Sequence, residues 1–170
     1  DGSADLPRYP LVVQRCVVCG HCQLTHAVMP DLLFRDYAYV SGTSETLRQW
    51  MVGFARQVAS DFNERCDTYK TQYPRVLDIA CNDGTLMEAF IAAGCEPDQV
   101  WGVDPADNLW AMTGEQKHLN TLLGYWDAAR ATSLLGLAGA PFDIITAFNV
   151  LAHTADPLGF LQTAVEALAP

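Results

Sequence analysis

Apolar residues follow a helical rhythm between residues 45 and 66 of the 170-residue chain. They recur every three or four positions and form one stripe, made of Leu47, Trp50, Met51, Phe54, Val58 and Phe62. Charged and amide side chains fill the positions between them. This pattern predicts one long amphipathic helix whose apolar face packs on a core. The Ser41-Gly42-Thr43-Ser44 stretch before it is typical of a helix start.

After Pro74 the rhythm changes, and short Val- and Ile-rich segments alternate with helical ones. The pattern predicts strands over 75–81, 100–104, 119–123 and 142–150, and helices over 85–93, 108–116, 127–137 and 156–168. Four β-α units in a row favour a Rossmann-like, doubly wound parallel sheet with helices on both faces, an α/β fold. Such a sheet has two open edges. We therefore expect further strands beyond residue 170 and association into a homo-oligomer.

The first forty residues show no such alternation. Residues 1–10 are polar and contain two prolines, which predicts an extended lead-in. Residues 11–18 predict a short strand, and Cys19-Gly20 predicts a turn because glycine accepts a positive φ.

Composition narrows the classes of function. Half of the residues are apolar, so the chain has enough apolar side chains for a folded core. Twenty acidic against ten basic residues give a net charge of −10, which argues against binding nucleic acid or an anionic membrane. No apolar run approaches membrane-spanning length, and no signal-peptide pattern is present. Three of six cysteines fall within seven residues, which is typical of metal or redox chemistry in a reducing, cytoplasmic compartment.

Candidate ligand-binding residues follow the first two strands of the β-α series. The stretch Leu77-Asp-Ile-Ala-Cys-Asn-Asp-Gly-Thr85 ends one strand in a turn of small residues and opens a helix. Asp104 ends the next strand, twenty residues after Gly84. Ligands of doubly wound sheets bind at the carboxyl ends of strands, where an acid at this position accepts both ribose hydroxyls. The alternative for Asp104 is a capping role before Pro105.

The turn does not suit a dinucleotide. It lacks the G-x-G-x-x-G pattern that makes room for a pyrophosphate, and Asp83 would repel one. Asp78 and Asp83 instead suit a ligand with a positive centre. S-adenosylmethionine (SAM) carries an ammonium and a sulfonium group and has no phosphate, so the acids favour it over NAD. The alternative for Asp78 is a strand-end residue that accepts hydrogen bonds from loop amides.

Several motifs resemble those of a known family. LDIACNDGTL, GVDPADN and DIITAFNVLAHTADP resemble the motifs of class I methyltransferases. More narrowly they resemble sugar C-methyltransferases, which act on nucleotide-linked deoxysugars. Upstream, LVVQRCVVCGHCQL and LFRDYAYVSGTSETLRQW are similar to that family's zinc-binding N-terminal part and its junction with the catalytic domain. The resemblance implies a remnant zinc-binding domain with a linker over 1–42 and an incomplete SAM-binding domain over 43–170.

The resemblance also implies roles for individual residues. It assigns a cofactor-binding role to Asp78, Ala80, Asn82, Asp83, Gly84, Asp104 and Asn149. It places His153, Tyr37 and Tyr39 on the catalytic side. The alternative for His153 is a structural histidine without an acid-base partner. Ala80 stands where the family usually has glycine, and the family's Tyr-His-Glu-His stretch with its general base has no counterpart in these 170 residues.

Cys16-Val-Val-Cys19-Gly has the form of a zinc knuckle, in which two thiolates bind one metal ion. The resemblance implies that the other two ligands come from a C-x-x-C pair upstream of residue 1. Cys22 and His26 are the local alternatives. A redox pair is disfavoured, because a thioredoxin-like C-x-x-C opens a helix and this one follows a strand.

The resemblance thus implies a methyltransferase that transfers the methyl group of SAM to a carbon atom of a nucleotide-linked sugar. Two other classes stay open. One is an NAD(P)-linked oxidoreductase of similar fold. The other is a catalytically inactive, zinc-stabilised module that binds the cofactor and a partner.

Overall fold

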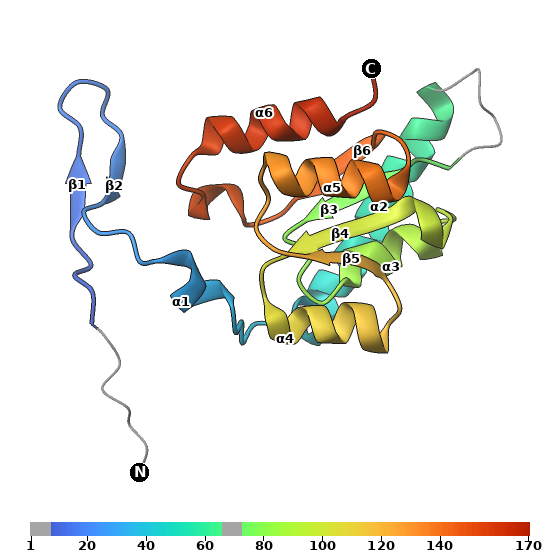
Figure 1. The fold of residues 1–170 in the computed structure, drawn as a ribbon, viewed down its shortest axis with the longest axis horizontal. Helices are drawn as coiled ribbons and strands as arrows, with labels where there is room; N and C mark the ends of the chain where they lie inside the picture. Colours follow the sequence, from blue (N-terminus) through green and yellow to red (C-terminus); the bar gives the residue numbers. More distant parts are fainter. Residues whose placement is uncertain (1–7, 66–72) are drawn as a thin grey trace, which may run out of the picture.

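The fold is a parallel four-stranded sheet between two layers of helices, with a separate N-terminal hairpin (Figure 1). The computed structural model describes residues 8–65 and 73–170. Most of the predicted lead-in, residues 1–7, lies outside the described residues, and so does Cys66, the last residue of the predicted long helix.

The central sheet has the strand order β5-β4-β3-β6, and all neighbours run parallel. Its strands are β3 (Val76–Ile79), β4 (Val100–Asp104), β5 (Asn120–Leu123) and β6 (Ile144–Ala147). The chain builds outward from β3 through β4 to β5 and then returns to the other side of β3 with β6. Ligands of such sheets bind outside the carboxyl ends of the strands at this reversal. Both Asp78 and Asp104 lie at these ends.

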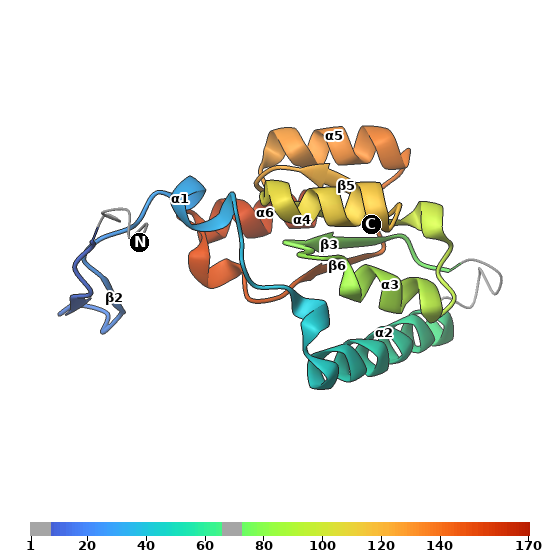
Figure 2. The ribbon, with the colours of Figure 1, turned by 90° about the horizontal axis from the view of Figure 1, so that it is seen from below.

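Helices cover both faces of the sheet (Figure 2). On one side, α2 (Glu45–Arg65) packs on α3 (Thr85–Ala92), and buried residues such as Met51, Ala55 and Phe90 form a core with β3. On the other side, α5 (Ala128–Ala138) and α6 (Pro157–Ala167) bury Leu134 and Phe160. The predicted doubly wound α/β fold is confirmed.

Local sequence explains where the helices begin and end. The side chains of Asp127 and Asp156 accept hydrogen bonds from the first-turn amides of α5 and α6. These aspartates satisfy amides that have no partner within the helix. Gly139 ends α5 with a φ of 75°, a conformation that costs glycine little.

Several element boundaries differ from the prediction. Only Val13–Arg15 of the strand expected over 11–18 is regular (β1), and it pairs antiparallel with an unpredicted strand, β2 (Cys22–Leu24). Both are exposed throughout, so no buried face produces an alternating pattern. The strand expected over 142–150 is limited to β6, because Asn149 adopts a φ of 54° and Phe142 pairs separately with Leu168.

The remaining short elements surround the carboxyl ends of the strands or connect the β-α units. They are α1 (Pro30–Phe34), η1 (Ser41–Thr43), η2 (Pro97–Gln99), α4 (Asp107–Trp110), η3 (Ala111–Gln116) and η4 (Leu151–His153). The helix expected over 108–116 is α4 continued by the π-helical η3. The pattern did not predict α1.

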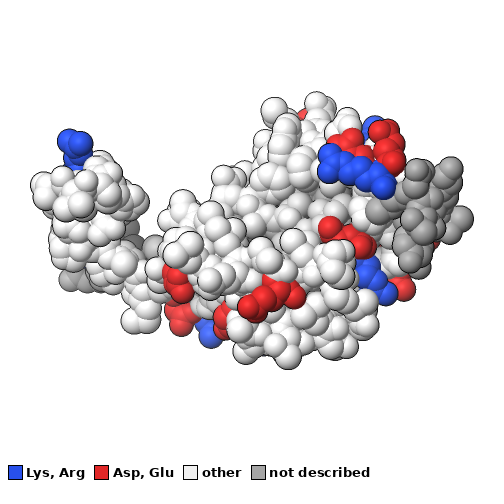
Figure 3. Space-filling model, turned by 90° about the horizontal axis from the view of Figure 1, so that it is seen from above, with Lys and Arg blue, Asp and Glu red and all other residues white. Residues whose placement is uncertain are grey.

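The surface drawn in Figure 3 is mainly uncharged, with acidic and basic side chains side by side in small groups. Among the described helices, none combines the length and the apolar character needed to cross a bilayer.

Candidate functional site

A cavity of about 870 Å³ opens at the carboxyl ends of β3, β4 and β6. This volume lies in the range of pockets that enclose small-molecule ligands. Eight of the residues singled out from the sequence line it: Tyr37, Tyr39, Asp78, Ala80, Asn82, Asp104, Asn149 and His153. Asp83 and Gly84 are not among its lining residues. The fold thus brings together residues that are up to 116 positions apart in the sequence.

Asp104 connects the loop after β3 to the loop after β4 and lines the cavity. Its Oδ2 accepts the amide of Asn82 at 2.9 Å, and its Oδ1 accepts the amide of Ala106 at 2.9 Å. Burial raises the pKa of Asp104, and the amides of Ala106 and Asn82 lower it. A carboxylate has about four acceptor positions, so each oxygen keeps a lone pair for a ligand hydroxyl. This arrangement is compatible with the predicted ribose site. It also gives Asp104 a role in supporting the loops after β3 and β4.

Asp78 is the most deeply buried acid facing the cavity. It is 4% exposed, and its Oδ1 accepts the hydroxyl of Thr146 on β6 at 2.7 Å. Burial raises the pKa of Asp78 to about 7; the Thr146 hydrogen bond opposes this shift and the nearby Asp104 carboxylate adds to it. A cationic ligand group would favour the ionised form. The sequence pattern did not single out Thr146, because its role depends on the pairing of β3 with β6.

The loop after β3 has an uncommon backbone conformation. Ala80 and Asn82 adopt φ values of 60° and 52°, in the left-handed region. Asparagine tolerates this region and glycine enters it freely, whereas alanine is strained there by about 1–2 kcal/mol. Ala80 is therefore held in this conformation by the surrounding fold, and it is one of the residues that line the cavity.

Replacement of Ala80 by glycine is expected to raise the free energy of unfolding by about 0.5–1 kcal/mol. Glycine removes the left-handed strain but loses more backbone entropy on folding. Urea denaturation measures the change. The matched control is Ala129→Gly at an exposed, helical position of α5, which is expected to lower stability. Equal destabilisation by both substitutions would show that Ala80 is unstrained.

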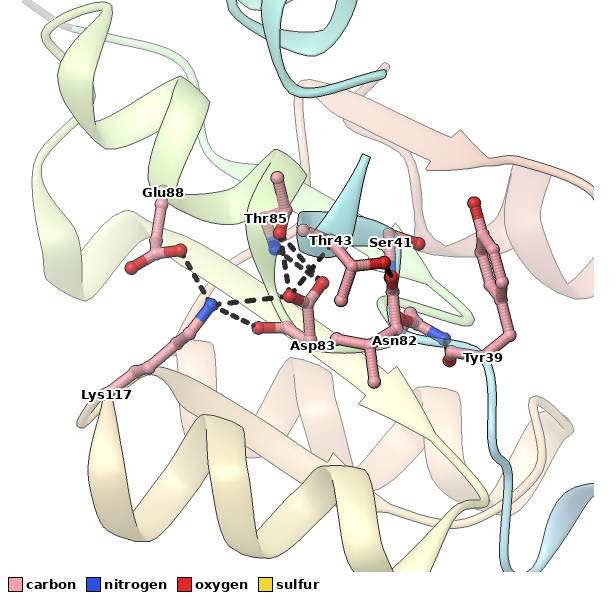
Figure 4. A network of polar contacts seen from close by, with 10 residues as sticks. Tyr39, Ser41, Thr43, Asn82, Asp83, Thr85, Glu88 and Lys117 are labelled. Carbon is pink, nitrogen blue, oxygen red and sulfur yellow. Dashed lines mark hydrogen bonds and ion pairs between the residues drawn. The ribbon is translucent and has the colours of Figure 1, made fainter. Parts of the chain in front are cut away.

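Asp83 lies at the N-terminus of α3 and takes part in a separate polar network (Figure 4). Its carboxylate accepts the Thr85 hydroxyl at 2.8 Å and the Gly42 amide at 3.2 Å. Lys117 Nζ lies 3.7 Å from Asp83 Oδ2 and also donates to Glu88 at 2.8 Å. A Cβ at position 42 would collide with the Asp83 carboxylate. The structure therefore gives Asp83 protein partners, including a cation, instead of a place in the cavity wall.

Aromatic side chains also line the cavity. Tyr37 and Tyr39 come from the segment between α1 and α2, and the His153 ring packs 5.8 Å from that of Phe34. Trp50, Tyr125 and Trp126 also line the cavity. Sequence reasoning assigned Trp50 to the core-facing stripe of the long helix, and it did not single out Tyr125 or Trp126. Trp50 does pack on Phe54 and Phe148, but it is 48% exposed.

Cys16 and Cys19 lie at the end of the N-terminal hairpin, away from the cavity lining. The backbone amides of Cys19 and Val18 and the side chain of Cys19 lower the pKa of the Cys16 thiol, and Gly20 turns the chain with a φ of 76°. This local geometry suits a pair of thiolate ligands. Zinc needs four ligands, however, and within residues 8–65 and 73–170 no three metal-ligating side chains come together. The structure gives no support for a complete zinc site.

Fold and cavity together define a Rossmann-like α/β domain with a ligand site at the switch point of its sheet. The model of the family described as "Methyltransferase domain" matches residues 51–170, and the chain belongs to this family.

Curated relatives agree with this membership. The ubiquinone biosynthesis O-methyltransferase of Caulobacter sp. (strain K31) is 32% identical over 122 residues, which cover 70% of this chain and 47% of the relative. The C-methyltransferase NovU of Streptomyces niveus is 32% identical over 108 residues, which cover 64% of this chain and 24% of the relative. The chain thus spans about half the length of the first relative and a quarter of the second.

Solved structures share the fold at low sequence identity. The plantazolicin methyltransferase BamL, in complex with SAH and a triazolic desmethylPZN analog, superposes with a TM-score of 0.55 at 16% identity, over 74% of this chain and 44% of that one. The related BpumL, in complex with SAH, gives a TM-score of 0.53 at 17% identity, over 74% and 45%. These similarities concern the fold alone.

Proposed function

We propose that this chain is the cofactor-binding part of a SAM-dependent methyltransferase. The observation that carries the proposal is the pair of buried carboxyl groups, Asp78 and Asp104, at the ends of adjacent strands and in the lining of one cavity. Membership of the methyltransferase family and the SAH in the BamL and BpumL structures support the choice of ligand.

The site fits a cofactor without phosphate. In dinucleotide-binding domains the pyrophosphate lies at the N-terminus of the first helix. Here the Asp83 carboxylate lies at that end of α3 and is 3% exposed, so a second anion there would be repelled. SAM carries two positive centres and no phosphate. Asp83 at the start of α3 therefore disfavours NAD(P), and the acids that line the cavity suit the positive centres of SAM.

Each predicted residue then has a task that its position allows. Asp104 accepts the ribose hydroxyls, and Asp78 faces the ammonium group. Ala80 and Asn82 shape the loop that passes the cofactor, and Asn149 faces it from the end of β6. Asp83 and Gly84 act indirectly, by fixing the start of α3. When bound, SAM supplies an electrophilic methyl group.

We further propose that the acceptor is a nucleotide-linked deoxysugar methylated on carbon. The resemblance of the motifs to sugar C-methyltransferases supports this, and so does the similarity to the C-methyltransferase NovU. Tyr37, Tyr39 and His153 line the cavity. In this proposal they contact the acceptor, and His153 takes up a proton. Four further points stay predictions: the domain boundary at residue 42, a zinc ion at Cys16 and Cys19, a cytoplasmic location and homo-oligomer formation.

Calorimetric titration with SAH, and with NAD in parallel, tests the cofactor. We expect saturable binding of SAH with one ligand per chain and no binding of NAD, because Asp83 disfavours a phosphate at α3. Circular dichroism of the same sample verifies that the protein is folded. Binding of NAD alone, or a folded protein that binds neither ligand, would contradict the proposal.

A further inference from the structure

Residues 35–42, here called the strap, link α1 to the start of α2 and run past the carboxyl ends of the strands (Figure 1). The strap contributes Tyr37, Tyr39 and Ser41 to the cavity lining. Within the strap only Ser41 and Gly42 belong to a regular element, the 3₁₀ turn η1, so the strap's own backbone offers few hydrogen bonds. Its position therefore depends on contacts with the rest of the domain.

One set of contacts comes from the loop after β3. The side chain of Asn82 uses both ends of its amide on the strap: Oδ1 accepts the Ser41 amide at 2.8 Å, and Nδ2 donates to the Tyr39 carbonyl at 3.0 Å. The neighbouring Asp83 accepts the Gly42 amide. Figure 4 shows Asn82 between Ser41 and Tyr39. The side chain of Asn82 is thus engaged by the strap.

An equivalent set comes from the first residues of α4, directly after the loop that follows β4. Asn108 Oδ1 accepts the Tyr37 amide at 3.0 Å, and its Nδ2 donates to the Tyr37 carbonyl at 2.9 Å. One residue earlier, the Asp107 amide donates to the Arg35 carbonyl at 2.9 Å. Asn108 is not among the residues that line the cavity, so its side chain acts on the strap and not on a ligand.

A single carboxylate supports both loops. Asp104 accepts the Asn82 amide on one oxygen and the Ala106 amide on the other. Ala106 directly precedes α4. A ligand bound to Asp104 therefore stabilises the loop after β3 and the start of α4, which together hold the strap, since opening either one would weaken the bound state.

We propose that Asn82 and Asn108 are positioning residues that couple occupation of the cofactor site to the placement of Tyr37 and Tyr39 on the acceptor side. This inference rests on the proposed function. It implies that cofactor binding orders Tyr37 and Tyr39, so that the acceptor meets a formed site only after the cofactor is bound.

Residue-resolved amide hydrogen exchange, measured by NMR with and without SAH, tests the coupling. In the wild type we expect saturating SAH to slow the exchange of the Tyr37 and Ser41 amides at least about tenfold, because openings that release the ligand become rarer. SAH binding with unchanged exchange at both amides would overturn the coupling. Absence of SAH binding would overturn the proposed function and the coupling together.

Two variants separate the effect of the Asn82 and Asn108 side chains on the strap from the effect of the ligand. Without SAH, Asn108→Ala is expected to speed exchange of the Tyr37 amide about threefold to tenfold and leave Ser41 unchanged. Asn82→Gly, which keeps the left-handed conformation, should speed exchange of the Ser41 amide and leave that of Tyr37 unchanged. Asn108→Ala should retain its SAH affinity within about threefold and lose the ligand-dependent protection of Tyr37. The control is Gln57→Ala on the exposed side of α2. Among the described residues, the side-chain amide of Gln57 bonds only to Asp61. Equal exchange in all variants would overturn the assignment.

Discussion

Replacement of Asp104 by alanine is expected to weaken SAH binding at least about 100-fold. Two hydrogen bonds from ribose hydroxyls to a partly buried carboxylate contribute roughly 1.5–3 kcal/mol each, and 2.7 kcal/mol corresponds to a 100-fold change. The substitution also removes the acceptor that the amides of Asn82 and Ala106 share, so both loops lose a support. The expected loss therefore exceeds that of a residue that only contacts the ligand.

Calorimetry of the variant measures the affinity, with Asp98→Ala as the matched control, because Asp98 is an exposed acid outside the cavity lining. Asp98→Ala should bind SAH as the wild type does. Urea denaturation of both variants shows whether a loss of affinity reflects a loss of folding. An Asp104→Ala protein that is folded and binds SAH with unchanged affinity would contradict the ribose assignment.

The position of Asp104 was predictable because it depends on local features. A short Val-rich strand ends in an acid, and the preceding β-α turn lies at a fixed distance in the sequence. Parallel strands bring their carboxyl ends to one edge, so the prediction needs only the fold class. The same logic predicted Asp78, Ala80 and Asn82 at the cavity.

Contacts across long sequence separations were not predictable. Asn82 lies 41 residues from Ser41, and Asn108 lies 71 residues from Tyr37. Their partners are backbone groups, which every residue offers, so no residue type marks them. Asp83 illustrates the same limit: its charge suggested a ligand with a positive centre, and the structure supplies Lys117, a cation of the chain itself.

Exposure was a further source of error. The hairpin of β1 and β2 has no buried face, so its hydrophobic pattern does not reflect its pairing. Conversely, Trp50 belongs to a helical stripe that packs on α3 over most of its length but meets the open cavity near the start of α2. A periodic pattern identifies the inward face of a helix, and it does not distinguish a filled core from a cavity wall.

The free energy of unfolding is expected to fall as the pH rises from about 4 to about 7, and Asp78 should account for much of this change. In the folded protein burial raises the pKa of Asp78 to about 7, from an ordinary value of 3.8. The folded state thus holds a proton that the unfolded state has released, so stability is lost as the pH rises through this window. Three pKa units correspond to about 4 kcal/mol at most.

The same proton predicts the pH dependence of ligand binding. The ammonium group of SAH favours the ionised carboxylate, so binding below pH 7 should release a proton from Asp78. Affinity should therefore increase between pH 5.5 and pH 7.5 and level off above. Calorimetry in buffers of different ionisation enthalpy detects the released proton directly.

Asp78→Asn separates this residue from the other acids. Asparagine keeps the size of the side chain and a partner for the Thr146 hydroxyl, which donates or accepts, but it does not titrate. Urea denaturation at several pH values should show that the difference in stability between wild type and variant changes by about 2–4 kcal/mol between pH 4 and pH 7.5. Burial also raises the pKa of Asp104, so a smaller fall with rising pH should persist in the variant. Thr146→Val should increase the pH dependence, because the Thr146 hydroxyl opposes the shift at Asp78. A wild type and an Asp78→Asn variant with parallel pH profiles would show that the pKa of Asp78 is not raised in the folded protein, and the predicted release of a proton on SAH binding would then be wrong.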